Sequence, residues 1–338
     1  MEEKDKSQKG EELLDINEKG VIIEKKEEKK PEKKSETFTH VLLAFLALVI
    51  LGLFLKIFIF NKNIEKNNIY HKLKTADDMN RNIGEAIIRF VRKNPKAKIG
   101  LATGTTPEGL YKYLINKYEK GEVSFKDVQF FSLDGMCGLE KTNQNSYYYI
   151  LTHSFLNKID AQEKNIHLIK EEGKTLQDFE KNAQEYNELL AKNQLDLQLL
   201  SFGENGHIGS NEPNTDLDLL THIVEINPET REKKKANFGG LENTPKYAIT
   251  QGIKNVLQAK EIIAMAKGKG KAKAVNEIVN GFYTKNCPVS VLKNHNKVTL
   301  YSDEEAGELI KEHNKKFYKI STYLFETRFR SCRARCPT

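Results

Sequence analysis

The sequence has few cysteines, and their spacing excludes two kinds of small-protein scaffold. Only four occur in 338 residues, at Cys137, Cys287, Cys332 and Cys336. No C-x-x-C pair is present, and no spacing of cysteine with histidine is typical of zinc. The pattern therefore indicates neither a disulfide framework nor a metal site, and we expect the main domain to occupy a reducing compartment.

Nucleic-acid-binding and nucleotide-binding patterns are also lacking. The formal net charge of +7 comes from lysines spread along the chain, and no arginine-rich stretch is interleaved with aromatic residues. We therefore expect no nucleic-acid partner. There is neither a Walker loop nor a G-x-G-x-x-G dinucleotide loop. The length suits one large α/β domain or two small ones.

Neither end of the chain carries the signals of a folded domain. Residues 1–36 are almost all Lys, Glu, Asp and small polar residues, which bury too little apolar surface to offset their ordering entropy. We predict that this segment is disordered. Residues 321–338 form a basic tail with no structural signal.

A long apolar run follows the charged segment. From Val41 to Leu55 there is no charged residue, and after Lys56 the run continues to Phe60. About 20 apolar residues are needed to cross a bilayer, so we predict a transmembrane helix over 38–60. A buried core helix fits less well because the run is apolar all round. A cleaved signal peptide fits less well because the run begins far from Met1.

From residue 65 to about 320 the sequence is typical of a globular α/β domain. We predict strands at 98–102, 128–133, 165–169, 195–203, 261–267 and 297–302. The predicted helices cover 77–93, 107–120, a charged segment ending near 192, 271–281 and 303–315. This alternation predicts a doubly wound, mostly parallel sheet in a Rossmann-like three-layer fold. Ligands of such sheets bind at the carboxyl ends of the strands, where the informative residues lie.

Two of these strand ends are suited to an anion. The strand 98–102 is followed by Thr103, Gly104, Thr105 and Thr106, and a proline then opens a helix. Hydroxyl groups and free N–H groups at a helix N-terminus can bind phosphate, although an ordinary capped turn has the same pattern. After strand 261–267, Lys271 stands among three further lysines at a helix N-terminus, where an anion would offset their repulsion.

The other two strand ends carry acid–base residues. Asp134 directly follows an apolar strand, as a general base or an N-cap residue would. The string SFGENGHIGSNEP at 201–213 places His207 and Glu212 among glycines and asparagines. A histidine in such a loop is a candidate for proton transfer. The four strand ends together predict a sugar-phosphate site.

The motifs around these residues resemble one enzyme family. The strings GLATGTTPEGLY, VSFKDVQFFSLDGMCGL, NSYYY, GENGHIGSNEP, PKYAITQGI and GKGKAKAV occur in the order found in glucosamine-6-phosphate deaminases. The resemblance covers roughly residues 68–315. The related 6-phosphogluconolactonases share the fold and the G-x-x-G-H core but lack the N-E-P ending.

The resemblance implies an activity and a set of site residues. The family converts glucosamine 6-phosphate and water into fructose 6-phosphate and ammonia, a hydrolytic deamination coupled to isomerisation in amino-sugar catabolism, with no metal or redox cofactor. Asp134 matches the base that moves a proton between C2 and C1. His207 matches the histidine that assists ring opening, and Glu212 matches its carboxylate partner. The loop Thr103, Gly104, Thr105 and Thr106 and the lysine Lys271 match the groups that bind the substrate phosphate.

Three departures from the family pattern bear on activity. Gly135 and Met136 stand where the family usually has glutamate and tyrosine. Asn205 stands where some members have aspartate, and it can still orient His207. Ala236 falls on a phosphate-binding arginine, for which the adjacent Lys235 can substitute only as a point charge.

These features leave alternatives to the deaminase. One is a 6-phosphogluconolactonase-like hydrolase, and another is a non-catalytic sugar-phosphate-binding module at the membrane. The oligomeric state is left open, with a homo-oligomer among the alternatives. We expect a single-pass membrane protein whose catalytic domain faces the cytoplasm, because hexosamine phosphates are made and consumed inside cells and do not cross a bilayer unaided.

Overall fold

The structure is a computed structural model that describes residues 40–52 and 68–317. The chain divides into two units, residues 1–64 and 65–338. The charged segment 1–36 and the basic tail 321–338 lie outside the described residues, so the predictions for them stay predictions.

The predicted membrane span lies only partly within the described chain. Residues 40–52 are helical, whereas 38–39 and 53–60 are not described. Within 40–52 and 68–317, no helix is both long enough and apolar enough to cross a bilayer. A transmembrane helix over 38–60 therefore stays a prediction.

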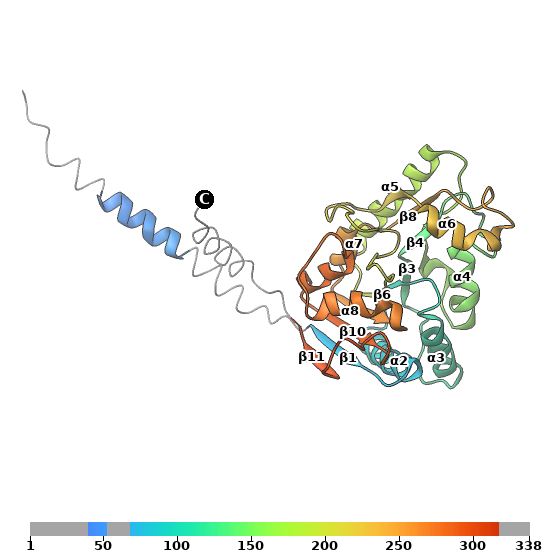
Figure 1. The fold of residues 1–338 in the computed structure, drawn as a ribbon, viewed down its shortest axis with the longest axis horizontal. Coiled ribbons are helices and arrows are strands. Elements are labelled where there is room, and N and C mark those ends of the chain that lie inside the picture. The colour runs from blue at the N-terminus through green and yellow to red at the C-terminus, as the bar shows by residue number, and fades with distance from the viewer. Residues whose placement is uncertain (1–39, 53–67, 318–338) are drawn as a thin grey trace, which may run out of the picture. The chain divides into compact units, whose positions relative to one another are not determined.

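The second unit is built on an eight-stranded sheet (Figure 1). Its strand order is β11-β1-β10-β9-β6-β2-β3-β5. The strands are β1 Ile69–Lys72, β2 Lys98–Leu101, β3 Gln129–Ser132, β5 Ile166–His167, β6 Leu197–Ser201, β9 Glu261–Ala266, β10 Val298–Ser302 and β11 Asn314–Lys316. All neighbours are parallel except β1 and β11, which are antiparallel. The predicted mostly parallel α/β sheet is confirmed.

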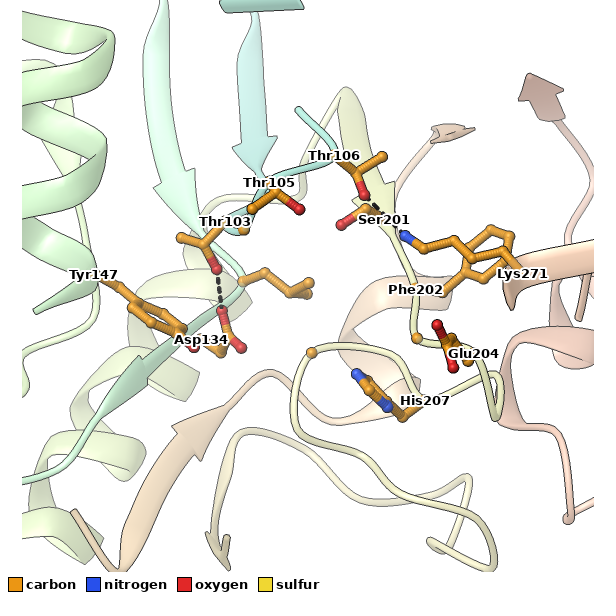
Figure 2. A pocket seen from close by; sticks show the side chains of 14 residues that line it. Thr103, Thr105, Thr106, Asp134, Tyr147, Ser201, Phe202, Glu204, His207 and Lys271 are labelled. Carbon is orange, nitrogen blue, oxygen red and sulfur yellow. Dashed lines mark hydrogen bonds between the residues drawn. The ribbon is translucent and has the colours of Figure 1, made fainter. Parts of the chain in front are cut away.

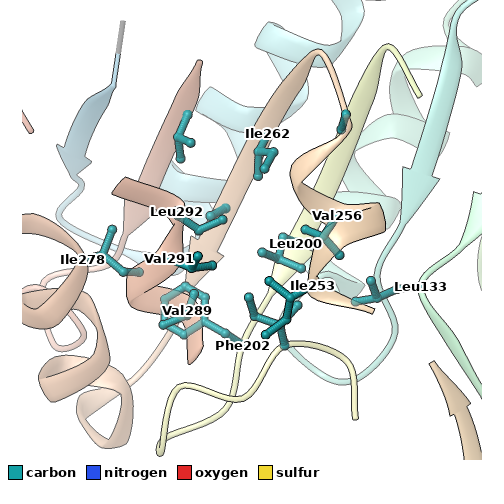
Figure 3. Close-up of a cluster of buried hydrophobic side chains, with 14 of the residues drawn as sticks. Leu133, Leu200, Phe202, Ile253, Val256, Ile262, Ile278, Val289, Val291 and Leu292 are labelled. Atoms are coloured by element: carbon teal, nitrogen blue, oxygen red, sulfur yellow. The ribbon is translucent and has the colours of Figure 1, made fainter. Parts of the chain in front are cut away.

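Helices cover both faces of this sheet. On β6, Leu197 and Leu199 belong to one buried cluster, whereas Leu200 and Phe202, the residue directly after the strand, belong to another. Since successive strand side chains point to opposite faces, the two clusters lie on opposite sides of the sheet. Figure 3 shows part of the cluster that contains Leu200. The fold is therefore doubly wound.

Most of the helices that the structure describes between 68 and 317 pack in one or the other of these two clusters. The helices in this range are α2 Ala76–Lys93, α3 Glu108–Glu119, α4 Tyr147–Ser154, α5 Leu176–Lys192, α6 Pro228–Lys234, α7 Ile253–Leu257 and α8 Ala272–Val279. The apolar faces of α2 and α3 pack in the cluster with Leu199, and those of α5, α7 and α8 pack in the cluster with Leu200. Thr75 caps α2 by accepting from the backbone N–H of Asp78.

The second unit also contains a smaller, three-stranded sheet, which includes Asp134. It has the order β4-β8-β7, from Asp134–Met136, Tyr247–Thr250 and His222–Glu225, and both pairings are antiparallel. The sequence analysis did not predict these strands. Asp134 is thus the first residue of β4, paired with Thr250, and not a loop residue after the strand β3.

The predicted helix over 303–315 is wrong. Residues 304–309 form turns, and the chain then adds β11 to the edge of the sheet. The Asp303 carboxylate accepts hydrogen bonds from the backbone N–H groups of Ala306 (2.8 Å) and Gly268. Because β1 offers an unpaired sheet edge, the segment gains ladder hydrogen bonds there that a continued helix would forgo.

Candidate active site

A cavity of about 340 Å³ lies where β9, β6, β2 and β3 end. These four strands are neighbours, and the chain order along the sheet reverses between them, which is the usual ligand position in an open α/β sheet. The cavity is large enough for a small phosphorylated sugar. Its walls are formed by Thr103, Gly104, Thr105, Thr106, Leu133, Asp134, Tyr147, Ser201, Phe202, Gly203, Glu204, His207, Gly209 and Lys271 (Figure 2).

A loop of threonines and a lysine form one side of the cavity. The segment 103–106 connects β2 to the N-terminus of α3, whose partial positive charge faces an anion favourably. The Lys271 ammonium donates a 2.8 Å hydrogen bond to Thr106 Oγ1. Burial lowers the pKa of Lys271 to about 8, with Glu204 and Asp303 opposing the shift. An ammonium that is partly stripped of water and held beside hydroxyl groups is suited to a phosphate.

Asp134 lies on another side of the cavity, with its carboxylate buried. Its Oδ1 accepts a 3.2 Å hydrogen bond from Thr103 Oγ1. Burial raises the pKa of Asp134 to about 6, while the charge of Lys234 and the bond from Thr103 act in the opposite direction. A carboxylate with a pKa just below neutral pH is ionised at pH 7 and is still basic enough to take up a proton.

His207 is linked to a carboxylate through an asparagine. Its Nδ1 lies 2.8 Å from Asn205 Oδ1, and Asn205 Nδ2 donates to Glu212 Oε2 at 2.8 Å. Glu212 Oε1 lies 3.8 Å from His207 Nδ1. Burial lowers the pKa of His207, Glu212 opposes this, and the charges of Lys271 and Lys234 reinforce it. The ring is therefore neutral at pH 7.

This chain of contacts fixes the tautomer of His207. The backbone N–H of His207 donates to Asn205 Oδ1 at 3.1 Å, so the amide nitrogen of Asn205 faces Glu212. The Asn205 oxygen then faces Nδ1 of His207, which must carry the proton. The Nε2 atom is left as a proton acceptor on a ring that lines the cavity.

The backbone of this loop depends on close packing. A side chain at Gly203 would collide with the His207 ring, so the loop can fold back over β6 only with glycine there. Asn211 is fully buried and donates 2.8 Å hydrogen bonds to the carbonyls of Ile208 and Gln251. These bonds hold the loop against the end of β8. Asn211 is therefore the structural part of the N-E-P string, and Glu212 is the part that reaches His207.

The structure brings most of the predicted site residues together. Thr103, Gly104, Thr105, Thr106, Asp134, His207 and Lys271 line one cavity. Asn205 and Glu212 stand behind His207 and connect to the cavity through it.

Lys235 does not line the cavity. Its ammonium pairs with Glu232 on the surface of α6. The neighbouring Lys234 points the other way and donates a 2.9 Å hydrogen bond to the hydroxyl of Tyr147, a cavity residue. Lys234 is half-buried, and burial lowers its pKa. The helix α6 ends at Lys234, so a one-residue step along the chain turns the side chain from the site to the surface.

Sequence reasoning missed further cavity residues. Tyr147, Ser201 and Glu204 line the cavity, and burial raises the pKa of the Tyr147 hydroxyl, which therefore stays protonated. Tyr147 belongs to the NSYYY string, which the sequence analysis singled out. The sequence alone does not tell which of its three adjacent tyrosines lines the cavity. The space that a side chain at position 135 would need is filled by the side chain of Glu171, which comes from the loop after β5.

Comparison with known proteins identifies the family. The profile of glucosamine-6-phosphate isomerases/6-phosphogluconolactonase matches residues 71–301. The chain belongs to this family. The resemblance that the motifs indicated is thereby confirmed for the second unit of the chain.

The alignments of this chain with curated relatives span nearly the whole length of those relatives. The chain is 36% identical over 245 residues to a glucosamine-6-phosphate deaminase of Thermoanaerobacter sp. (strain X514), which covers 72% of this chain and 96% of the relative. It is 37% identical over 243 residues to one of Shouchella clausii (strain KSM-K16), covering 72% and 97%.

Solved structures agree with this placement. A monomeric glucosamine-6-phosphate deaminase superposes with a TM-score of 0.67 and 32% identity, covering 71% of this chain and 99% of that one. A 6-phosphogluconolactonase of Trypanosoma brucei has a TM-score of 0.59 and 16% identity, covering 71% and 98%, and so shares the fold alone.

Proposed function

We propose that this protein converts glucosamine 6-phosphate and water into fructose 6-phosphate and ammonia. The observation that carries the proposal is one cavity that joins an anion cradle, a neutral histidine of fixed tautomer and an ionisable aspartate. The relatives that match most of the second unit are named for this activity.

The substrate phosphate is assigned to the threonine loop and Lys271. The hydroxyl groups of residues 103–106 and the N-terminus of α3 supply hydrogen bonds, and the ammonium supplies charge. The sugar then extends from this cradle toward His207 and Asp134. Its binding is independent of Lys235, whose ammonium is paired with Glu232 on the surface.

His207 is assigned to ring opening. Its Nε2 takes the proton of the hydroxyl on C1 and returns it to the ring oxygen, so that the open-chain aldehyde forms with no net proton change. The neutral state and the protonated Nδ1 are what this step requires. Asn205 and Glu212 stabilise the imidazolium that forms in passing.

Asp134 is assigned to the isomerisation. Its carboxylate takes the proton from C2 and delivers it to C1, while one proton of the amine nitrogen passes to the C1 oxygen. The C1 aldehyde thereby becomes a hydroxymethyl group and the C2 amine becomes an imine. Water adds to the imine and ammonia leaves, giving the ketose. Burial raises the basicity of this carboxylate, which suits proton transfer from carbon.

The test is a side-by-side assay of the purified protein. Release of ammonia from glucosamine 6-phosphate is measured together with hydrolysis of 6-phosphogluconolactone. We expect ammonia release that is abolished in Asp134→Asn and strongly reduced in His207→Gln. Faster hydrolysis of the lactone would favour the lactonase. Tight binding of the amino-sugar phosphate without turnover would favour a non-catalytic binding module.

We also propose that the protein is anchored in a membrane through residues 38–60, with the catalytic unit in the cytoplasm. The support is the charge-free run from Val41 to Leu55 and the intracellular supply of hexosamine phosphates. Alkaline extraction of membranes and protease treatment of intact cells test this. Release by alkali, or digestion of the catalytic unit without lysis, would reject it.

A further inference from the structure

Glu171 is a buried carboxylate beside the site, although it does not line the cavity. It lies in the loop after β5, and only 2% of its surface is exposed. Both of its oxygens accept backbone hydrogen bonds: Oε2 from the N–H of Met136 at 2.9 Å, and Oε1 from the N–H of Tyr148 at 2.8 Å. Nothing in the proposed mechanism uses this group so far.

These two contacts join the elements that carry two cavity residues. Met136 is the last residue of β4, which begins with Asp134. Tyr148 lies in the first turn of α4, directly after Tyr147. An N–H in the first turn of a helix has no partner within the helix, so Glu171 acts as a capping group for α4. One carboxylate therefore ties the strand of Asp134 to the helix of Tyr147.

The backbone of Glu171 adds a further link to the same segment. Its carbonyl accepts a 2.8 Å hydrogen bond from the N–H of Gly138. Burial raises the pKa of Glu171 to about 8, with the nearby charge of Asp134 acting in the same direction and the backbone donors opposing it. The two carboxyl groups are thus close enough to affect one another.

Gly135 is the spatial complement of Glu171. A Cβ atom at position 135 would lie 2.7 Å from Cγ and 3.1 Å from Cδ of Glu171, which is too close for either to stay. A side chain at position 135 and the carboxylate of Glu171 therefore compete for one space. The acidic residue that is missing beside Asp134 in the sequence is present in the structure, supplied from a loop 36 residues further along the chain.

We propose that Glu171 is a positioning residue, whose carboxyl group holds Asp134 and Tyr147 in register across the cavity and replaces an acidic side chain at position 135. The inference rests on the proposed deaminase function. A residue that fixes the geometry of a base affects turnover more than substrate binding, because the phosphate cradle of Thr106 and Lys271 lies on other elements.

The experiment compares four variants of the full chain: Glu171→Gly, Glu171→Gln, Gly135→Glu, and the exchange Gly135→Glu/Glu171→Gly. A matched control is Glu180→Gln, an exposed carboxylate on α5. For each variant, kcat and KM for ammonia release are measured together with the thermal unfolding midpoint. Glu171→Gln keeps the volume of the side chain but turns one acceptor into a donor, so it probes geometry in a protein that still folds.

We expect Glu171→Gly to lower kcat about 100-fold, the size of effect that a displacement of about 1 Å produces, with KM changed less than about threefold. Glu171→Gln should lower kcat about 10-fold, since it loses one of the two bonds. The exchange should recover at least about 10-fold in kcat over Glu171→Gly, because the acid returns to the same space from the other side. Glu180→Gln should match the parent.

Two results would overturn the inference. One is a kcat within twofold of the parent in Glu171→Gly and Glu171→Gln, with only the unfolding midpoint lowered. The other is an exchange variant no more active than the poorer single variant. Hydrogen exchange at the Met136 and Tyr148 amides gives a readout without turnover: unchanged exchange in Glu171→Gly would reject the positioning role. A parent that releases no ammonia would instead reject the proposed function.

Discussion

Asn205 Oδ1 lies 2.8 Å from His207 Nδ1. The same oxygen accepts a hydrogen bond from the backbone N–H of His207 at 3.1 Å, and the amide nitrogen donates to Glu212. These two contacts together set the orientation of Asn205 and the tautomer of His207. An aspartate at position 205 would place a second negative charge beside Glu212. Asparagine instead connects Glu212 to His207 through hydrogen bonds and adds no charge.

This relay predicts the effect of Glu212→Gln. A glutamine carries no charge, so the imidazolium that forms during ring opening loses the negative charge beside it, whereas the backbone N–H of His207 still holds the Asn205 oxygen in place. We expect kcat to fall about 10- to 100-fold, within the range that general acid–base catalysis contributes, with KM little changed. Steady-state kinetics of ammonia release measure this. The control is Glu225→Gln, an exposed residue on β7, and a kcat within twofold of the parent in Glu212→Gln would contradict the relay.

Lys271 is predicted to bind the substrate phosphate. A hydrogen bond to a charged group contributes about 1.5–3 kcal/mol, so Lys271→Met should raise KM about 10- to 100-fold, with a smaller effect on kcat. Because burial lowers the pKa of Lys271 to about 8, KM of the parent should also rise above pH 8, as the ammonium loses its proton.

A matched control lies two residues away. Lys269 is on the surface and pairs with Glu308 at 3.4 Å, so Lys269→Met removes the same charge from the same segment without touching the cavity. Its KM should equal that of the parent. Equal increases in KM for both variants would show that the lysines act only through general charge attraction.

Asp134→Asn is predicted to remove activity and to stabilise the fold. Burial raises the pKa of Asp134 from 3.8 to about 6, so its neutral form is favoured in the folded protein. That stabilising preference is fully present below pH 3.8 and is lost as pH rises through 6. At pH 7 the ionised carboxylate thus costs about 3 kcal/mol, which the neutral asparagine avoids.

Chemical unfolding of parent and variant at pH 4 and pH 7 tests this. The gain in the free energy of unfolding should be near zero at pH 4 and largest at pH 7. A variant that is inactive and no more stable at pH 7 would argue that burial of Asp134 is compensated by contacts beyond those with Thr103 and Lys234.

The central part of the fold could be predicted from the sequence because its signals are local. Strands β2, β3, β6, β9 and β10 are short apolar runs between turns, and their buried positions leave few alternatives. The smaller sheet carries no such signal. Its strands β4 and β8 have three and four residues and pair across more than 100 residues of chain, so only the tertiary fold brings them together.

The difference between local signals and tertiary contacts also explains which site residues could be predicted. The threonine loop, Asp134, His207 and Lys271 each follow a predicted strand, and parallel strands bring their ends to one edge. Lys234 and Glu171 follow no such rule. Lys234 reaches Tyr147 because α6 ends there, and Glu171 reaches β4 because Gly135 leaves it room. These contacts depend on packing between segments, which sequence periodicity does not report.

The last prediction separates the two adjacent lysines of α6. The positive charge of Lys234 lowers the pKa of Asp134, because it favours the ionised carboxylate. In Lys234→Met this charge is gone, so the pKa of Asp134 should rise above about 6 and the pKa of His207 should rise as well. Since both groups act as bases, the acidic limb of the kcat/KM profile should move to higher pH. Activity should consequently fall more at pH 6 than at pH 8.

Lys235→Met serves as the control, because the ammonium of Lys235 pairs with Glu232 on the surface of the same helix segment. It removes an equal charge one residue away and should leave the acidic limb where the parent has it. If both variants shift the limb equally, the effect comes from the overall charge of α6. If neither does, the limb is set neither by Asp134 nor by His207, and the assignment of the base has to move to another carboxylate of the site.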